Sequence, residues 1–375
     1  YGSGASAGPC SAELYSYLRI ADINDDGRLN VSDLKSVSDE KATDYLLKPN
    51  DIVFARTGAS TGRNYFYDGT DGEFVFAGFL IKFSLDPKKV NPRYIKYYCI
   101  SKDYRDWVAA FNTGSTRGNI NAQTLASMPI SLPDRAIQNR IVKVLDAIEE
   151  KRKSNAKIND NLYAQAKAIF AQRFIGIETI PDGWKKGNLL DIANYLNGLA
   201  MQKFRPRDDE VGLPVLKIKE LRQGSCDVSS ELCSPSIKPE YIVHDGDVIF
   251  SWSGSLLVDI WCGGTCGLNQ HLFKVTSETY DQWFYYLWTA HHLERFIAIA
   301  ADKATTMGHI KRGELEKAEV LIPSEKDYKE ISSLMNPLFN LIIANRIEAR
   351  KLAELRDELL PKLMSGEIDV SEVSV

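Results

Sequence analysis

The sequence repeats itself, and this internal duplication limits the possible folds more than any other feature. The segment Ser115–Ile120 resembles Thr305–Ile310, and the offset of 190 residues between them continues without a gap for sixty residues. Along this stretch the paired positions include Leu125 and Leu315, Ile130 and Val320, Pro133 and Pro323, Asn155 and Asn345, Leu162 and Leu352, and Gly176 and Gly366. An ordered series of this length indicates two copies of one folding unit.

The match extends upstream with slightly larger offsets. The paired segments there are Leu18–Ile20 with Leu216–Ile218, Asp51–Phe54 with Asp247–Phe250, and Phe79–Phe83 with His271–Val275. Because gaps separate these matches, the upstream part of each copy has diverged more than the downstream part.

The two copies differ at their beginnings. The second copy has an opening segment, Ile180–Ala193, before Tyr195, whereas Tyr1 lies close to the equivalent of Tyr195. The first copy therefore lacks roughly one opening strand. We expect either that a further segment precedes Tyr1 or that the tail Glu367–Val375 supplies this edge in a circular arrangement.

Length and composition describe a globular protein of more than one domain. A chain of 375 residues exceeds the usual size of one core, and the hydrophobic and charged fractions, 44% and 26%, are ordinary. We expect a cytoplasmic protein without membrane association, because no apolar run approaches ~20 residues and six cysteines without a pairing pattern suit a reducing compartment. The net charge of −4 argues against a uniformly basic surface but permits local basic faces.

Each copy has an α/β part followed by a long helix. Short β-rich runs are separated by turn residues, namely Asp51–Ala55, Phe74–Phe83, Val248–Ser251 and Leu272–Val275, and helical stretches are predicted at Pro92–Ala110 and Tyr280–Ala300. The long helices are predicted at Asp134–Arg173 and Lys326–Met364. Proline precedes each long helix, and glycine follows each one at the position of a C-terminal cap.

A heptad pattern runs along both long helices. Every seventh residue is Ile141, Ile148, Asn155, Leu162 and Ile169 in the first, and Ile331, Leu338, Asn345, Leu352 and Leu359 in the second. One asparagine in an apolar seam weakens it but selects a register, so we expect Asn155 and Asn345 to align the two helices. About 40 residues at 1.5 Å each give a rod of roughly 60 Å.

Several motifs together resemble the specificity subunits of type I restriction-modification systems. They are the ending Leu355–Ile368 (LRDELLPKLMSGEI), the turn Gly114-Ser115-Thr116, a strand ending at Pro133 before a helix, and Asn269–Phe273 (NQHLF). The resemblance covers nearly the whole chain, and the missing opening strand is its one departure. It implies an α+β protein in which two α/β target recognition domains in tandem are separated by two long helices, packed as an antiparallel coiled coil.

The resemblance also implies a domain plan and a set of partners. The expected boundaries are 1–133 and 177–323 for the recognition domains, 134–176 and 324–366 for the spacer helices, and 367–375 for the tail. Each domain is expected to bind one half of a split, asymmetric site in double-stranded DNA. Two methyltransferase subunits, which carry S-adenosylmethionine, and restriction subunits with translocase and nuclease activity are expected to assemble on a chain that itself has no cofactor.

The candidate DNA-binding residues lie in loops or on predicted strands and have side chains suited to bases or phosphates. In the first copy they are Arg19, Arg56, Thr57, Ser60, Thr61, Arg63, Asn64, Ser115, Thr116, Arg117 and Asn119. In the second they are Lys203, Arg205, Arg207, Lys217, Lys219, Ser253, Ser255, Thr305, Thr306, His309 and Lys311. Arg56 corresponds to Trp252, and Arg117 to Met307.

Each of these groups has a structural alternative. Residues 56–64 also fit a solvated hairpin loop, and the duplicated loop at 115–119 also fits a purely structural turn. Arg19, Lys217 and Lys219 are predicted on strands and could face DNA or water. The basic cluster at 203–207 is followed at once by three acids, Asp208, Asp209 and Glu210, so an ordinary charged loop is equally consistent with it.

The segment Asp22–Asp33 has the spacing of a calcium-binding loop, with oxygen ligands at positions 1, 3, 5, 9 and 12 and glycine at position 6. However, a strand, Tyr17–Ile23, is predicted before it where a helix should stand. Its counterpart, residues 219–224, lacks the ligand pattern and is predicted to keep the strand. We therefore favour a turn stabilised by Asx hydrogen bonds over a calcium site.

Metal and catalytic motifs are weak. Cys226, Cys233, Cys262 and Cys266 lack the compact spacing of a zinc site, so free cysteines are favoured and no bound metal is expected. We find no glycine-rich cofactor loop, no nucleophile elbow and no metal-binding histidine pair on a helix, since the adjacent His291 and His292 face different sides, and we expect a non-catalytic chain. Two further hypotheses remain open: a duplicated scaffold that binds only proteins, and a calcium-dependent module.

Overall fold

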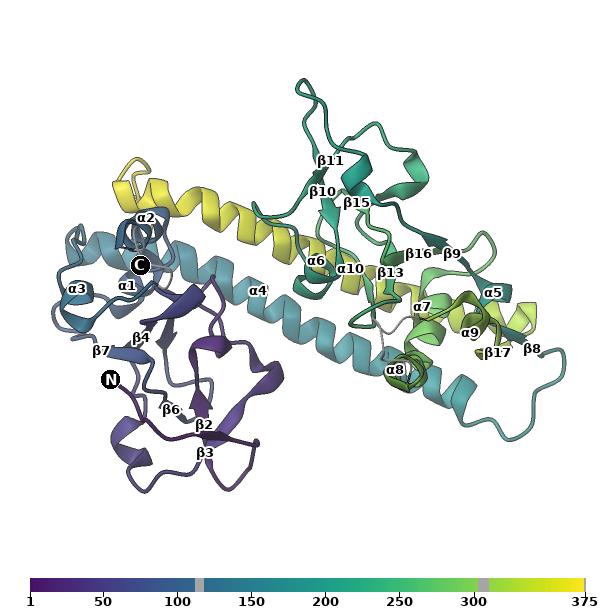
Figure 1. Ribbon diagram of the computed structural model, residues 1–375, viewed down its shortest axis with the longest axis horizontal. Helices are drawn as coiled ribbons and strands as arrows, with labels where there is room; N and C mark the ends of the chain where they lie inside the picture. Colours follow the sequence, from purple (N-terminus) through teal and green to yellow (C-terminus); the bar gives the residue numbers. More distant parts are fainter. Residues whose placement is uncertain (112–117, 303–309, 374–375) are drawn as a thin grey trace. The chain divides into compact units, whose positions relative to one another are not determined.

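The structure is a computed structural model that describes residues 1–111, 118–302 and 310–373. The chain divides into two compact units (Figure 1). Unit 1 comprises Tyr1–Glu150 and Ala353–Val375, and unit 2 comprises Lys151–Leu352. Each unit contains one α/β domain and a portion of both long helices.

The same antiparallel sheet forms the centre of each α/β domain. In unit 1, β4 (Asp51–Ala55) lies between β5 (Asn64–Tyr67) and β7 (Leu80–Ser84). In unit 2, β13 (Val248–Ser251) lies between β14 (Leu257–Ile260) and β16 (Leu272–Thr276). The central strands are buried along their whole length, which explains their continuous apolar runs.

A second sheet in each unit is built around a parallel pair. The pair is β2 (Tyr15–Leu18) with β6 (Phe74–Phe76) in unit 1, and β10 (Leu213–Leu216) with β15 (Cys266–Leu268) in unit 2. Leu18 is opposite Phe76, and Leu216 is opposite Leu268, so the register is the same in both copies. The strands that extend these sheets are β1 (Ala7–Gly8), β3 (Lys35–Val37), β11 (Leu232–Cys233) and β12 (Ile242–Val243). This common topology confirms the duplication.

The shorter helices also occur in matched sets. They are α1 (Pro92–Tyr98), α2 (Lys102–Phe111) and α3 (Ala122–Ala126) in unit 1, and α7 (Gln282–His291), α8 (Leu293–Asp302) and α9 (Arg312–Glu316) in unit 2. Each predicted helical stretch is thus two helices. In unit 1 the break lies at Ser101, whose hydroxyl accepts a hydrogen bond from the Tyr104 N–H in the first turn of α2 (3.3 Å).

The predicted long helices are confirmed as α4 (Arg135–Phe170), continued by a π-helical turn at Ala171–Ile175, and α10 (Glu325–Ser365). Within unit 2, Asn155 Nδ2 donates to Glu348 Oε2 (2.6 Å), and Asn159 Nδ2 donates to the Ile342 carbonyl (3.1 Å). The residue numbers of the partners on α10 therefore fall as the residue numbers on α4 rise, so the two helices pack antiparallel.

The two seam asparagines lie in one layer of this helix pair. Asn155 and Asn345 are 1% and 9% exposed. Asn155 Nδ2 also reaches the Asn345 carbonyl at 3.4 Å, and Asn345 Nδ2 donates to Asn159 Oδ1 at 2.9 Å. These side-chain hydrogen bonds form in only one register, as the predicted alignment role requires, although Asn155 Oδ1 accepts no hydrogen bond from the described residues.

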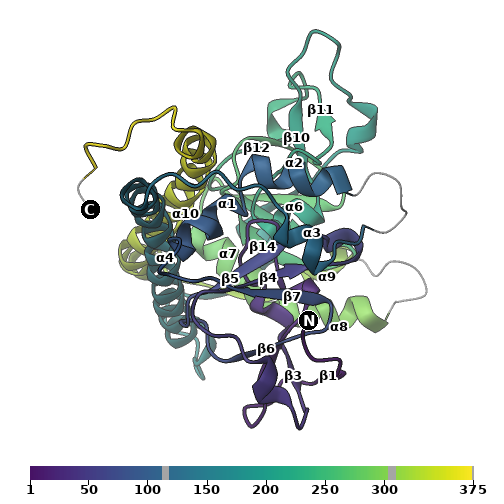
Figure 2. The same ribbon diagram turned by 90° about the vertical axis from the view of Figure 1, so that its left-hand side faces the viewer.

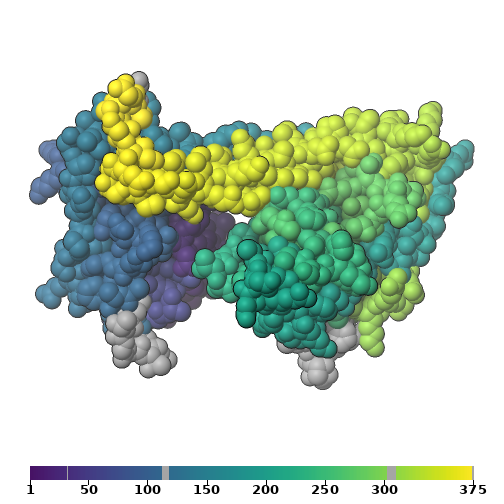
Figure 3. Space-filling view, turned by 90° about the horizontal axis from the view of Figure 1, so that it is seen from above, coloured from purple at the N-terminus to yellow at the C-terminus, as the bar shows by residue number. Residues whose placement is uncertain are grey.

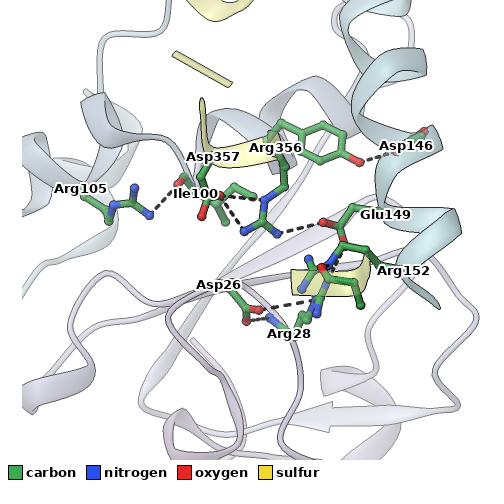
Figure 4. A network of polar contacts seen from close by, with 11 residues as sticks. Asp26, Arg28, Ile100, Arg105, Asp146, Glu149, Arg152, Arg356 and Asp357 are labelled. Atoms are coloured by element: carbon green, nitrogen blue, oxygen red, sulfur yellow. Dashed lines mark hydrogen bonds and ion pairs between the residues drawn. The ribbon is translucent and has the colours of Figure 1, made fainter. Parts of the chain in front are cut away.

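In unit 1, acidic residues of α4 form ion pairs with arginines of the α/β domain and of α10. Glu149 accepts hydrogen bonds from Arg28 in the α/β domain and from Arg356 of α10 (2.9 Å), which also contacts Asp357 (Figure 4). One turn earlier, Asp146 accepts from Arg93 (2.7 Å) of α1.

In unit 2 the charges are reversed, with arginines on the helix and carboxylates in the α/β domain. Arg346 of α10 makes two hydrogen bonds to Asp259, at 2.8 and 2.6 Å, and Arg350 contacts Asp245 at 2.8 Å. Desolvation opposes the charge of Arg346, yet the pairing with Asp259 raises its pKa. In both units, arginine–carboxylate pairs therefore fix the α/β domain to the helices.

The opening of the second copy forms a strand pair. In unit 2, β8 (Lys185–Asn188) pairs antiparallel with β17 (Glu319–Ile322), and it is followed by α5 (Leu189–Ile192) and β9 (Asn194–Asn197). The strand predicted to end at Pro133 is the counterpart of β17, and this prediction is wrong for unit 1, where residues 129–132 form no strand. Their carbonyls instead accept hydrogen bonds from tyrosine hydroxyls, Tyr98 to Pro129 (2.8 Å) and Tyr94 to Ser131 (3.0 Å).

The C-terminal tail packs against unit 1 without forming a strand in the described residues 366–373. Val370 is 5% exposed and belongs to the apolar cluster against which Ile130 also packs. Figure 2 shows the tail leaving the end of α10, and Figure 3 shows this yellow segment against the blue surface of unit 1. The tail thus packs on the apolar core of unit 1 as an irregular segment.

The strand predicted near the start of each domain is too long. β2 ends at Leu18, and a 3-10 turn (Ile20–Asp22) follows, so Arg19 is not on a strand. In unit 2 the chain leaves β10 at Leu216 and forms α6 (Ile218–Gln223), so Lys217 caps a helix and Lys219 lies in its first turn. In both copies, a side chain three residues on accepts from the backbone N–H at this turn, Asp22 in one and Glu220 in the other.

Within the described residues, the structure contains no helix that is both long and apolar enough to cross a membrane.

The charged cluster of unit 1 gives a stability prediction. Replacing Glu149 with glutamine leaves two buried or half-buried arginines without their shared anion, so we expect the free energy of unfolding to fall by about 3 kcal/mol. Glu150→Gln on the same turn of α4 is the control, because Glu150 is exposed. Equilibrium urea unfolding measures both variants, and a difference between them below about 0.5 kcal/mol would contradict this role for Glu149.

Candidate DNA interface

The loop that follows β4 is built by two glycines and a threonine. Gly58 and Gly62 have φ angles of 76° and 88°, which favour glycine, and a Cβ at Gly62 would lie 2.4 Å from a methyl group of Val108. The Thr61 hydroxyl bonds to the carbonyls of Gly58 (2.7 Å) and Gly118 (3.0 Å). This loop is therefore tied to the segment that precedes α3, and its conformation is fixed.

Arg56 lies at the start of this loop, with its guanidinium carbon 4.9 Å from the centre of the Tyr1 ring. Its Nε is buried and has no hydrogen-bond partner among the described residues. Thr57 forms a β-bridge with Asn119. The structure thus brings together the predicted residues Arg56, Thr57, Thr61 and Asn119, with Ser60 in the short 3-10 turn between them.

Other predicted residues of unit 1 are bound internally. Arg63 pairs with Asp25 (2.6 Å), and Arg19 pairs with Asp22 (2.6 Å), whose hydrogen bond raises the pKa of Arg19. Asn64 is 5% exposed, and its amide donates to the Cys99 carbonyl (2.6 Å). These contacts give Arg19, Arg63 and Asn64 a place in the fold of the loops. Ser115, Thr116 and Arg117 lie outside the described residues.

The carboxylates of Asp22–Asp33 are engaged by basic side chains. Asp22, Asp25 and Asp26 contact Arg19, Arg63 and Arg28 respectively, and Asp33 contacts Lys35 at 2.5 Å, which lowers the pKa of Asp33. The backbone makes a turn instead, with the Gly27 N–H donating to the Asn24 carbonyl (3.1 Å) and the Arg28 N–H donating to Asp26 Oδ1 (3.2 Å). This geometry is that of an Asx-stabilised turn, as the sequence favours.

The equivalent loop of unit 2 is more apolar. Trp252 follows β13, and its Nε1 donates to Asn197 Oδ1 (2.9 Å). Ser253 is 4% exposed and bonds to His271 Nδ1 (2.9 Å), and the Ser255 carbonyl accepts from the Ser251 hydroxyl (2.9 Å). Of the matching loop, Thr305, Thr306 and His309 lie outside the described residues.

A pocket of about 580 Å³ opens beside Trp252. Its lining combines aromatic, amide and cationic side chains: Asn194, Tyr195, Leu196, Asn197, Trp252, Phe273, Ile310, Lys311 and Arg312. The rings of Trp252 and Phe273 lie 5.7 Å apart at 33°. Lys311, a predicted DNA-binding residue, is exposed at this pocket.

The remaining predicted residues form a separate group around Glu231. Lys217 and Arg205 contact its two oxygens, at 2.6 and 3.8 Å, and the hydrogen bond from Lys217 lowers the pKa of Glu231. Lys219 pairs with Asp227 (3.3 Å). Lys203 is exposed at the end of a 3-10 turn, and the Arg207 backbone N–H donates to Glu210 (3.0 Å). Much of the positive charge here is thus matched by carboxylates.

The four cysteines of unit 2 do not form one group. Cys226 and Cys266 lie in one apolar cluster, Cys233 in another and Cys262 in a third. Burial raises the pKa of the Cys262 thiol to about 11. Among the described residues, no three His, Cys, Asp or Glu side chains are placed to hold a metal ion.

The structure adds residues that the sequence prediction missed. Tyr1, Asn197, Phe273 and Arg312 all belong to the two loop environments just described. Tyr1 and Asn197 can be located by the glycine that follows each of them, because Gly2 and Gly198 occupy the same tight position in the two copies. Tyr1 therefore corresponds to Asn197, two residues beyond the match at Tyr195 suggested by the sequence.

Comparison with known proteins identifies relatives of the whole chain. Residues 10–164 and 181–356 match the family model described as the type I restriction modification DNA specificity domain. The chain is 26% identical over 309 residues to the type I restriction enzyme MjaIX specificity subunit of Methanocaldococcus jannaschii, which covers 76% of this chain and 71% of that protein. It is 25% identical over 400 residues to the EcoKI specificity subunit of Escherichia coli, covering 94% and 82%.

A solved structure shows the same fold. The crystal structure of the S subunit of a type I restriction-modification system from M. genitalium superposes with a TM-score of 0.52, covering 96% of this chain and 93% of that one. The sequence identity is 14%, so this likeness concerns the fold alone.

Because the carboxylates of Asp22–Asp33 are paired with basic side chains, we expect calcium to leave the stability of the protein unchanged. A bound ion would stabilise the folded state by mass action, but the oxygens it needs already accept bonds from arginine and lysine. We therefore expect the same Tm in millimolar calcium and in a chelator, with magnesium as the control. A calcium-specific rise of several degrees, abolished in Asp26→Asn, would instead establish a calcium loop.

Proposed function

Since the chain belongs to the family of the type I restriction modification DNA specificity domain, we propose that each of its two α/β domains recognises one half of a split, asymmetric DNA site. The chain is a type I specificity subunit with two recognition domains. The observation that carries the proposal is the loop after β4 and β13, where one backbone framework holds different side chains. Two different sequences can therefore be bound by two copies of one fold.

We propose that the chain is divided into five segments. Residues 1–133 and 177–323 are the recognition domains, 134–176 and 324–366 are the spacer helices, and 367–375 is the tail. The proposed DNA contacts are the loops after β4 and β13 and the segments before α3 and α9. In the group around Glu231, we expect phosphate contacts only from positive charge that the neighbouring carboxylates do not neutralise.

We assign the helix pair the role of a spacer. Its antiparallel packing and its asparagine layer define one register, and a fixed register is what a constant gap between half-sites requires. Fixed spacing between two DNA-binding elements is the same principle by which dimeric proteins select half-site separation.

The chemistry of modification is assigned to partners. The family implies two methyltransferase subunits that bind S-adenosylmethionine and methylate adenine, and restriction subunits that translocate and cleave DNA. In this proposal the chain is the non-catalytic subunit on which they assemble. Its acidic net charge of −4 is consistent with partners that supply part of the affinity for DNA.

Footprinting of the chain bound to its methyltransferase subunits tests the proposal. Two protected segments with a constant unprotected gap are expected, and log K should fall linearly with log salt in proportion to the phosphates contacted. A single continuous footprint, or none with partners present, would refute recognition of a split site.

The spacer role predicts the effect of adding one heptad to each helix. The insertions lie between Glu149 and Asn155 in α4 and between Asn345 and Arg356 in α10, where they keep the apolar seam in phase. Seven residues lengthen a helix by about 10 Å, or roughly three base pairs, so the gap should grow while both half-site sequences stay the same. A changed half-site would contradict the spacer role, and insertion in α4 alone is the out-of-register control.

Independent domains predict modular specificity. Exchanging residues 196–322 for the same region of another specificity subunit should change one half-site and leave the other half-site and the gap unaltered. Sequencing of DNA methylated by the reconstituted complex measures both halves at once. Simultaneous change of both halves would show that the domains do not act separately.

A further inference from the structure

The tight turn between β6 and β7 of unit 1 carries an exposed aromatic side chain. The Leu80 N–H donates to the Ala77 carbonyl (2.9 Å), so Gly78 and Phe79 occupy the two central positions of this turn. Phe79 is 60% exposed, whereas Ala77 and Leu80 are buried. One exposed apolar residue is ordinary on a protein surface, so its role must be judged from its backbone and its neighbours.

The backbone of this turn is held from two sides. The Ser3 N–H donates to the Phe76 carbonyl (2.9 Å), and a Cβ at Gly78 would lie 3.1 Å from the Ser3 carbonyl oxygen, so the segment around Ser3 packs directly on the turn. From the other side, the Arg56 N–H donates to the Phe79 carbonyl (3.1 Å). The Phe79 ring therefore projects from a fixed backbone, and a preorganised side chain loses little entropy on binding.

The Phe79 side chain lies on the same face as that of Arg56. β4 and β7 pair Ala55 with Leu80, and the hydrogen bond between Arg56 and Phe79 continues this ladder by one pair. Opposite residues of an antiparallel pair share one face, and successive residues alternate between faces. Ala55 and Leu80 are 1% and 0% exposed and face the core, so Arg56 and Phe79 face away from it, at the start of the loop proposed to bind DNA.

Arg56 supplies positive charge beside this exposed ring. Arg19 and Arg63 are paired with Asp22 and Asp25, whereas Arg56 forms no ion pair with the described residues. Its charge attracts the phosphate backbone, and the neighbouring phenyl ring has no hydrogen-bonding group. DNA that approaches the loop after β4 therefore meets an apolar contact surface next to a cation.

We propose that Phe79 contacts the 5-methyl group of a thymine in the half-site bound by unit 1 and thereby selects thymine at one base pair. This inference rests on the proposed DNA-binding function and names one base of that half-site. In the major groove thymine is the base that presents a methyl group, and phenylalanine is among the side chains that contact it. A protein partner is the competing occupant, but the adjoining cation and the continuity with the DNA-binding loop favour DNA.

The same position in unit 2 holds a side chain of a different kind. His271 corresponds to Phe79, because its carbonyl also accepts the N–H of the first residue after the central strand. The His271 ring is bonded on both sides, with Nδ1 2.9 Å from the Ser253 hydroxyl and Nε2 3.4 Å from the Gln270 amide. An imidazole engaged in this way belongs to the internal structure of its loop. We therefore expect this thymine contact in unit 1 alone.

The test removes the methyl group from the DNA. A selection from random duplexes, with the chain in complex with its methyltransferase subunits, first defines the two half-sites. Each thymine of the half-site bound by unit 1 is then replaced singly by deoxyuridine, which lacks only the methyl group, and Kd is measured for each duplex. One replacement should weaken binding roughly fourfold, as expected for the loss of one buried methyl group, and the others should have little effect.

A variant of the protein then identifies the side chain that the methyl group contacts. Phe79→Ala should weaken binding to the unmodified duplex and should be insensitive to the same deoxyuridine, because the two changes remove one contact. Leu132→Ala is the matched control, since Leu132 is 52% exposed and lies outside the proposed DNA-binding loops. It should leave the fourfold sensitivity unchanged.

A second measurement uses the unaltered chain, so that it does not depend on the folding of a variant. 5-Iododeoxyuridine, whose iodine replaces the methyl group, is placed at the sensitive position and irradiated in the complex. Mass spectrometry should identify Phe79 as the crosslinked residue. A crosslink only to other residues, or no crosslink, would overturn the assignment.

The remaining outcomes are equally decisive. Undiminished sensitivity of Phe79→Ala to the deoxyuridine would refute the contact, and so would a half-site for unit 1 that contains no thymine. Weaker assembly with the methyltransferase subunits, with the thymine preference retained, would place Phe79 in a protein interface instead. Absence of any enriched half-site for the wild type would refute the proposed function itself, whereas the other failures leave that function intact.

Discussion

The packing of α4 against α10 is the interaction on which the rest of the structure depends. Neither α/β domain completes its core without it. In unit 1, Leu145 of α4 and Leu360 of α10 belong to the same buried cluster as Phe54 of the central strand. In unit 2, Phe170 and Met335 belong to the cluster that contains Phe250. A heptad seam alone would allow the helices to slide, and the hydrogen bonds donated by the Asn155, Asn159 and Asn345 amides oppose sliding because they form in one register only.

Charge then determines which surface of the helix pair receives which domain. Unit 1 places carboxylates on α4, Asp146 and Glu149, against arginines of its domain, whereas unit 2 places arginines on α10, Arg346 and Arg350, against carboxylates of its domain. If either domain met the helix surface of the other, like charges would face each other. A duplicated chain is at particular risk of such an exchange, because its two domains share one fold, and opposite polarity opposes it.

Features that recur in both copies were predicted from the sequence, whereas features that depend on one local environment were missed. Apolar periodicity and caps located α4 and α10 within a few residues, and the 190-residue offset paired Asn155 with Asn345. The strand predicted before Pro133 failed because strand formation needs a partner, and hydrogen bonds from Tyr94 and Tyr98 replace that partner in unit 1. Arg56 was proposed as a DNA-binding residue from the sequence because arginine in a loop is a recognisable signal. Tyr1 and Asn197 were missed because their role depends on a backbone approach between distant segments, which no local pattern records.

The proposed function requires that two equivalent positions of one duplicated fold contact two different half-sites of one duplex. Photocrosslinking tests it most directly, with a crosslinking amino acid placed at position 56 or at position 252 of the chain in its methyltransferase complex. We expect each probe to mark a single short segment of DNA, the two segments to differ in sequence, and the number of base pairs between them to be constant. Crosslinks from both positions to the same bases, or from either position to scattered sequences, would contradict it.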